Sequence, residues 1–103
     1  MTQEFPLLRQ AQELQRLLRE LQKDLADREV EGVSGGGAVR CVVTGDLDVR
    51  SVHIEPALLT AEHAGAIDEL VTAAVRDAVR AAVELKRGET EKVTGGILTD
   101  LGL

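Results

Sequence analysis

Apolar side chains in the first quarter of the chain repeat at the spacing of a coiled-coil seam. Six of them are separated alternately by four and three residues: Leu7, Ala11, Leu14, Leu18, Leu21 and Leu25. Leu8 and Leu17 widen the stripe, and Pro6 suits the first turn of a helix, where its missing N–H needs no intrahelical partner. The pattern predicts a long helix over residues 6–29. A helix cannot bury such a stripe against itself, so the seam requires a partner helix within the fold or in another subunit.

Two runs rich in β-branched residues follow this helix. The segments "AVRCVV" and "VRSVHIE" are separated by Gly45-Asp46, a dipeptide typical of hairpin turns. A short additional strand is expected at residues 30–34. The sequence therefore predicts two or three antiparallel strands within residues 30–55.

Apolar positions alternate regularly in the first run and irregularly in the second. In the second run Val52 and Ile54 share a face, whereas Val49 is out of phase with them. The mismatch indicates either a β-bulge or a change of face. In the first run three positions share one face: Val39, Cys41 and Val43.

A second helix is predicted after Pro56, over residues 60–87. Thr60 is the expected N-cap, and Gly88 is the expected stop. Residues 88–103 are polar and rich in glycine, and they are expected to form a tail. Nothing in the sequence separates domains, so residues 1–103 are expected to form one domain. The apolar positions that predict this helix are Ile67, Leu70, Val71, Ala74, Ala78, Ala82 and Leu85.

The composition favours association of the chain with a second copy. Among 103 residues Phe5 is the one aromatic, and the other apolar residues are mostly Leu, Val and Ala, which bury less area each. A chain of this kind builds a deep monomeric core with difficulty, and a partner subunit would relieve the shortage. The formal net charge of −6 argues against tight, purely electrostatic binding to nucleic acid or an anionic membrane, although it leaves room for a local basic face.

Glycines crowd the segment "GVSGGGAV" at residues 32–39. A phosphate-binding P-loop needs Lys and Ser or Thr after its last glycine and then a helix, whereas Gly37 is followed by Ala38 and a strand. The fingerprint G-x-G-x-x-G also fails, because Arg40 stands three residues after Gly37. We interpret the stretch as a turn or bulge that needs positive φ angles.

The reactive side chains show no catalytic or metal-binding pattern. His53 and His63 lack a His or Cys partner at i+4, and a metal site needs at least three converging ligands. Cys41 falls on an apolar strand face, where a buried, inert thiol is usual. We therefore expect no enzymatic activity, no catalytic or metal-binding residues, no cofactor and no small-molecule substrate.

The cysteine count and the N-terminal sequence indicate a cytoplasmic protein. A single cysteine allows no disulfide within the chain and fits a reducing compartment. The start "MTQEFPLLRQ" lacks the pattern of a signal peptide, and no run approaches the ~20 apolar residues that span a bilayer. We expect no association with membranes.

Basic residues form a stripe on the first predicted helix. Arg9, Arg16 and Lys23 repeat every seven residues opposite the seam, and Arg19 lies beside them. A ladder of surface ion pairs explains this stripe as well as an anion-binding face does. The acidic residues that would complete the ladder follow at i+4: Glu13, Glu20 and Asp27.

The second predicted helix carries a sparser basic stripe. Arg76 and Arg80 are like charges at i and i+4, a pair that is mildly unfavourable unless an anion lies nearby. Arg87 lies further along the same face, and Asp77 and Glu84 can soften the repulsion. Neither stripe is as dense as the basic patch of a dedicated DNA reader. The lack of aromatics also disfavours binding of single strands by base stacking.

The order of these features resembles the YbaB/EbfC family of bacterial nucleoid-associated proteins. The resemblance runs from about Leu7 to Gly96 and rests on an ordered set of positions rather than on one motif. Those in the strand region are Ser34, Gly35, Gly37, Val39, Gly45, Val52, Ile54, Glu55 and Pro56. Those in the second helix are Leu70, Val71, Ala74, Asp77 and Ala78.

The resemblance implies an α+β fold in which a helix, a three-stranded antiparallel sheet and a second helix follow in the order α-β-β-β-α. It implies a homodimer that forms through the sheet, with helices projecting like the arms of tweezers. It also implies binding of duplex DNA in the nucleoid, with an influence on nucleoid organisation or gene expression and no catalysis or cofactor.

Two functional hypotheses follow for this chain. In the first, basic residues of the two helices contact DNA phosphates with little direct base readout: Arg9, Arg16, Arg19, Lys23, Arg76, Arg80 and Arg87. In the second, the protein is a dimeric adaptor that does not bind DNA, and its Leu7–Leu25 seam or its projecting arms clasp a protein partner.

Overall fold

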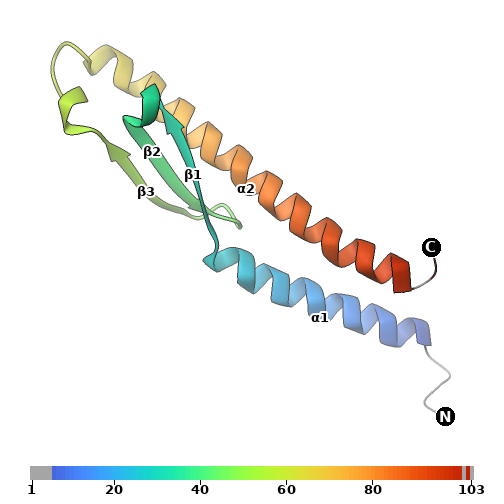
Figure 1. Cartoon of the computed structure of the whole chain (residues 1–103). Helices are drawn as coiled ribbons and strands as arrows, with labels where there is room; N and C mark the ends of the chain where they lie inside the picture. The colour runs from blue at the N-terminus through green and yellow to red at the C-terminus, as the bar shows by residue number, and fades with distance from the viewer. Residues whose placement is uncertain (1–5, 101, 103) are drawn as a thin grey trace.

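The chain folds as two helices and a small sheet in the predicted order α-β-β-β-α. The computed structural model describes residues 6–100 and residue 102. The predicted fold class is confirmed, including the short strand before the glycines. The elements are α1 (Pro6–Asp27), β1 (Glu29–Ser34), β2 (Val39–Thr44), β3 (Val49–Ile54) and α2 (Ala64–Asp100), with short 3₁₀ turns η2 (Gly35–Gly37) and η3 (Pro56–Leu58) (Figure 1).

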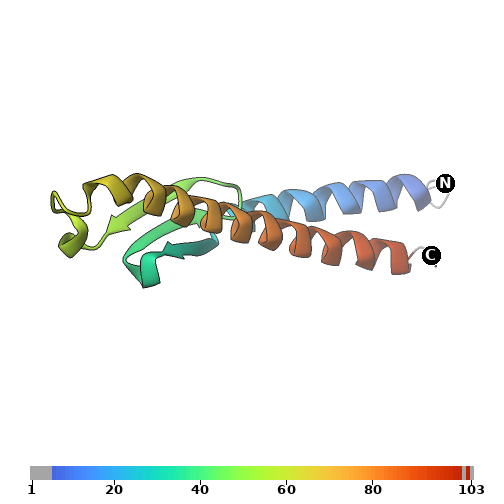
Figure 2. The ribbon, with the colours of Figure 1, turned by 90° about the horizontal axis from the view of Figure 1, so that it is seen from above.

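The molecule is strongly elongated. Its principal extents are 74 × 22 × 14 Å, and its radius of gyration is 20.1 Å, compared with about 13 Å for a compact domain of this length. The sheet and the first half of α2 form one end. At the other end α1 and the second half of α2 run antiparallel as a projecting arm, which brings the described ends of both helices together (Figures 1 and 2).

The three strands form one antiparallel sheet in the order β1-β2-β3. Val42 pairs with Ser51 and Val43 pairs with Val49, so Arg50 is an extra residue in β3. The irregularity predicted at Val49 is therefore a β-bulge. It returns Val49 to the face of the sheet that its partner Val43 occupies.

The core lies between α2 and the strands β1 and β2. Three side chains of β2 are fully buried, as their shared face predicted, and they meet a stripe of small residues on α2. Gly32 on β1 makes this packing possible, because a Cβ at this position would lie 2.1 Å from the backbone N of Ala78. The buried residues of this cluster are Val39, Cys41, Val43, Ala74, Ala78 and Ala82.

The glycine-rich stretch is a turn with positive φ angles, as predicted. Gly35, Gly36 and Gly37 have φ angles of 59°, 69° and 95°. They form η2, which reverses the chain between β1 and β2. At the other end of β2, the N–H of Gly45 donates to the carbonyl oxygen of Leu25 at 3.0 Å and so fastens the next hairpin to the end of α1.

The predicted bounds of the first helix and the start of the second were wrong by a few residues. α1 ends at Asp27 rather than at 29, because Glu29 already pairs with Thr44 in the sheet. α2 begins at Ala64 rather than at 60. Thr60 does not cap it, since its hydroxyl lies 2.9 Å from Nδ1 of His63 within a preceding turn.

The predicted stop at Gly88 and the predicted tail over residues 88–103 were also wrong. α2 continues through Gly88, Gly95 and Gly96 to Asp100; residues 101 and 103 lie outside the described residues. A glycine in a helix interior costs about 1 kcal/mol relative to alanine. Contacts of α2 with α1 and with Arg28, which follows α1, oppose this cost. Among them is an ion pair of 3.3 Å between Nη1 of Arg28 and Oε1 of Glu89.

Gly32→Ala is expected to destabilise the fold by about 1–3 kcal/mol or more, because its Cβ would meet the backbone of α2 rather than a flexible side chain. Gly88→Ala is the matched control. No atom lies within 4 Å of a Cβ built at Gly88, so alanine there should stabilise α2 by about 0.5–1 kcal/mol. Urea unfolding of the two variants measures both changes. A neutral Gly32→Ala would contradict the close packing of α2 on β1.

Candidate nucleic-acid interface

The seven basic residues predicted to contact phosphates are all exposed. They occupy two separate regions of the molecule. Four lie on α1 in the arm, and the other three lie on the side of α2 opposite its buried alanines, where Arg87 also lines a hollow with Leu47 of the hairpin turn. The structure therefore does not gather them into one patch. Those on α1 are Arg9, Arg16, Arg19 and Lys23, and those on α2 are Arg76, Arg80 and Arg87.

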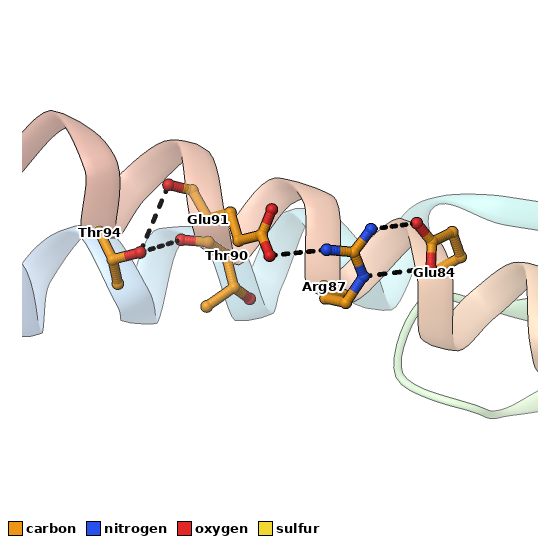
Figure 3. Close-up of polar contacts among 5 residues, drawn as sticks. All are labelled: Glu84, Arg87, Thr90, Glu91 and Thr94. Atoms are coloured by element: carbon orange, nitrogen blue, oxygen red, sulfur yellow. Dashed lines mark hydrogen bonds and ion pairs between the residues drawn. The ribbon is translucent and has the colours of Figure 1, made fainter.

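Arg87 lies between two carboxylates on its own helix (Figure 3). Its Nη1 pairs with Glu91 at 2.6 Å, and its Nε donates to Oε2 of Glu84 at 3.1 Å. The guanidinium hydrogen bonds hold the pKa of Glu84 below its ordinary value, and the same contacts raise the pKa of Arg87. Glu84, which was expected to soften the repulsion between Arg76 and Arg80, pairs with Arg87 instead, and this cluster of one arginine and two glutamates carries a net negative charge.

Arg16 has the same arrangement on α1. Its Nη1 pairs with Glu20 at 2.6 Å, and its Nε donates to Oε2 of Glu13 at 3.0 Å. The hydrogen bond from Arg16 lowers the pKa of Glu13. The ion-pair explanation of the α1 stripe is thus confirmed at Arg16. A phosphate would have to compete with two carboxylates for either of these guanidinium groups.

Arg76 and Arg80 differ from Arg16 and Arg87 in having no carboxylate partner among the described residues. Within residues 6–100 neither side chain makes a hydrogen bond or an ion pair. Asp77, which could have softened their repulsion, instead accepts a hydrogen bond of 3.0 Å from the backbone N–H of Val33 and holds β1 against α2. These two like charges therefore share the outer face of α2 without a direct carboxylate contact.

Lys86 is a basic residue whose position the sequence did not reveal. It lies near Gly88, where the sequence predicted the end of the helix, but α2 continues for three more turns. It lines a hollow of about 320 Å³ between the helices together with Arg19 of α1. Only the packing of α1 on α2 brings these two cations to one site, so no local sequence pattern could have indicated it.

An apolar surface lies beside this cationic face. Because α2 packs on β1 and β2, Val49 and Val52 on β3 stay exposed, although they lie on the core face of the sheet. Leu47 of the hairpin turn and Val83 of α2 are exposed too, and both line a hollow of about 470 Å³ rimmed by polar side chains. These apolar side chains lie next to one another on the surface rather than in the core.

Burial raises the pKa of the Cys41 thiol, as expected for an inert core residue. Over the described part of the chain, no three His, Cys, Asp or Glu side chains converge into a metal-binding group. None of the helices within residues 6–100 combines the length and the apolar character needed to cross a membrane.

The chain is elongated, and it exposes basic side chains on α2 and apolar side chains on β3. Residues 1–97 match the model of the YbaB/EbfC DNA-binding family. The chain belongs to this family, so the resemblance noted in its sequence is confirmed. Because the family consists of DNA-binding proteins and not of enzymes, the expectation that the chain is not an enzyme is confirmed as well.

The sequences of bacterial relatives align with most of the chain. A nucleoid-associated protein of Saccharopolyspora erythraea is 41% identical over 97 residues, which cover 94% of this chain and 84% of the relative. A nucleoid-associated protein of Rhodopseudomonas palustris (strain BisB18) is 35% identical over 97 residues, covering 94% and 92%. The uncharacterized protein HP0035 of Helicobacter pylori shares the fold, with a TM-score of 0.67 at 22% identity, covering 76% of this chain and 82% of that one.

Arg87→Gln is expected to raise the pKa of Glu84 toward its ordinary value, because the lowering comes first from the Arg87 hydrogen bond. The lowered folded-state pKa means that the ion pair stabilises the fold above the unfolded pKa, and that this stabilisation is lost as pH falls through the folded value. NMR titration of the Glu84 carboxyl measures the change. Arg76→Gln is the control and should leave that titration unaltered; an equal effect from both variants would contradict a local cause.

Proposed function

We propose that this chain is a cytoplasmic, nucleoid-associated protein that binds duplex DNA as a homodimer through phosphate contacts. The family and the names of its relatives support DNA binding in general terms. The observation that carries the phosphate contacts is the pair Arg76 and Arg80, exposed on the outer face of α2 without a carboxylate partner among the described residues. An anion between them would relieve the repulsion of two like charges one turn apart.

The basic residues differ as candidate phosphate contacts, because some of them already form ion pairs with carboxylates. Arg16 and Arg87 already have two acidic partners each, so a phosphate adds little attraction there. Arg19 and Lys86, which line one hollow, lack such partners within residues 6–100 and add positive charge where the arm leaves the body. Arg9 and Lys23 extend the contact surface along α1. A protein of net charge −6 would bind DNA through this local set, with low affinity at physiological salt.

The apolar side of β3 supports the homodimer. Burying Val49 and Val52 against the same surface of a second copy would complete a core that α2 closes only over β1 and β2. A self-complementary patch of this kind produces a closed, two-fold dimer. The dimer would carry two copies of the α2 cationic face, which doubles the phosphates within reach.

Removing the α2 pair should weaken binding on every DNA sequence alike. Arg76→Gln with Arg80→Gln is expected to lower the log–log salt slope of binding by about 2, at roughly 0.9 per phosphate contact. Fluorescence anisotropy of a labelled duplex of about 30 base pairs, titrated at several salt concentrations, measures both affinity and slope. Arg50→Gln is the matched control. It removes one positive charge from the sheet, where Arg50 pairs with Asp48 and donates to the carbonyl oxygen of Ala26.

The same assay tests whether the ion pairs of Arg87 weaken DNA binding. Glu84→Gln with Glu91→Gln releases Arg87 and should tighten binding and steepen the slope by about 1. Unchanged affinity and slope in the Arg76/Arg80 variant would remove these residues from the interface. Absence of binding at low salt by a folded dimer would overturn the DNA-binding proposal and favour the adaptor, whose partner contacts lie on the α1 seam.

Val52→Arg is expected to convert the dimer to monomers, because it places a charge in the apolar strip beside α2. Val33→Arg is the matched control: Val33 is 46% exposed and Val52 is 44% exposed, but Val33 lies on the opposite face of the sheet. Sedimentation equilibrium of both variants, with circular dichroism as the folding check, measures the outcome. A folded Val52→Arg variant that stays dimeric would place the interface elsewhere.

A further inference from the structure

The coiled-coil seam of α1 is covered at only one of its ends. Leu25 is 2% exposed and lies under the hairpin at Gly45. Toward the tip of the arm the seam opens to solvent, where Leu7 is 73% and Leu8 is 55% exposed. Leucines exposed to this extent and in a row are the pattern of a surface that another helix covers.

On this half of the seam Leu7, Leu8 and Leu18 stay exposed although α2 runs beside α1 (Figure 1). The two helices run antiparallel, and Thr90 lines the same hollow as Leu18, so the stretch of α2 beyond Thr90 accompanies the outer half of α1 (Figures 1 and 2). That stretch includes Gly95 and Gly96, which present no side chain. The described residues that line a separate hollow of about 320 Å³ over the outer half of the seam all belong to α1: Leu8, Ala11, Gln12, Leu14, Gln15 and Leu18.

The electrostatics of α1 favour an identical helix as its partner. Pro6–Asp27 holds four basic and four acidic residues and has no net formal charge, whereas the whole chain carries −6. The four positions that flank the outer seam carry no charge: Leu8, Gln10, Gln15 and Leu17. Charges at the flanking positions of a coiled coil normally select partners, so two copies of α1 can pair without repulsion. An apolar, neutral strip offers nothing to DNA.

We infer that the outer half of α1 pairs antiparallel with the same segment of a second molecule, arm tip to arm tip. In this register Leu7 faces Leu18 of the second copy, and Ala11 faces Leu14. The antiparallel direction follows from the shape, because the sheet ends of the two molecules then point away from each other, which separates their acidic parts. It also places each helix dipole against one of opposite direction.

The seam contact uses none of the residues proposed for the sheet dimer. If both contacts form, each dimer has two arms, and each arm can join a further dimer. Two different self-complementary surfaces on one chain produce an open chain of dimers rather than a closed particle. This consequence, but not the seam contact itself, rests on the homodimer of the proposed function. Such a chain would connect dimers bound at distant points on DNA.

The test combines variants of the two surfaces and measures mass by sedimentation velocity from about 10 to about 500 µM, a range that covers weak self-association. The seam variant is Leu7→Gln with Leu8→Gln, which changes only exposed side chains and adds no charge. Its matched control is Leu59→Gln: Leu59 is 61% exposed and follows η3 at the sheet end of the molecule. The sheet variant is Val52→Arg. Circular dichroism establishes that each variant is folded.

We expect the wild type and Leu59→Gln to gain mass beyond the dimer as concentration rises, and the seam variant to stay dimeric. Val52→Arg should be a monomer at the lower end of this range and should form dimers through α1 only as its concentration rises, and the variant with all three changes should remain a monomer throughout. A wild type whose mass remains constant over the whole range, or a seam variant that associates like the wild type, would overturn the seam contact. If Val52→Arg alone leaves every mass unchanged, only the sheet dimer fails.

Discussion

The close approach of α2 to β1 at Gly32 determines the rest of the architecture. Without a side chain at this position, the backbone of the helix rests on the strand, and the small side chains of Ala74 and Ala78 fill the remaining space. Asp77 adds a hydrogen bond to the N–H of Val33. Because the helix is held over β1 and β2, the apolar face of β3 stays open. The same contact turns Arg76 outward on the opposite side of α2.

The charges of the molecule are organised by neighbours along each helix more than by overall balance. Arg16 and Arg87 each have one carboxylate a turn before and one a turn after on the same helix, so the positive charge of both arginines is neutralised locally. Exposed ion pairs of this kind contribute little to stability. In the proposed DNA-binding function, they would leave only a subset of the arginines and lysines available to a phosphate. This explains how an acidic chain can present a local cationic face.

In the arm, the sequence predicted an end of the second helix that lies too early in the chain. Gly88 has the local signature of a helix stop, and the glycines after it strengthen that impression. Beyond Gly88 the helix runs alongside α1 (Figure 1), and Arg28, which follows α1, pairs with Glu89. A sequence pattern reports local preference, whereas the end of a helix depends on the packing that its next turn gains. The site was affected in the same way: the stripes were visible in the sequence, but the meeting of Arg19 with Lys86 was not.

The sequence by itself determined the order of elements, the seam of α1, the buried face of β2 and the need for positive φ angles at Gly35 to Gly37. Each of these follows from a periodicity or from the backbone freedom of one residue type, and both are local properties. Only the tertiary structure decided that Val49 sits beyond a bulge, that α2 covers two strands of three, and which arginines keep a carboxylate-free face. Those outcomes depend on how far one element can approach another, which no single segment encodes.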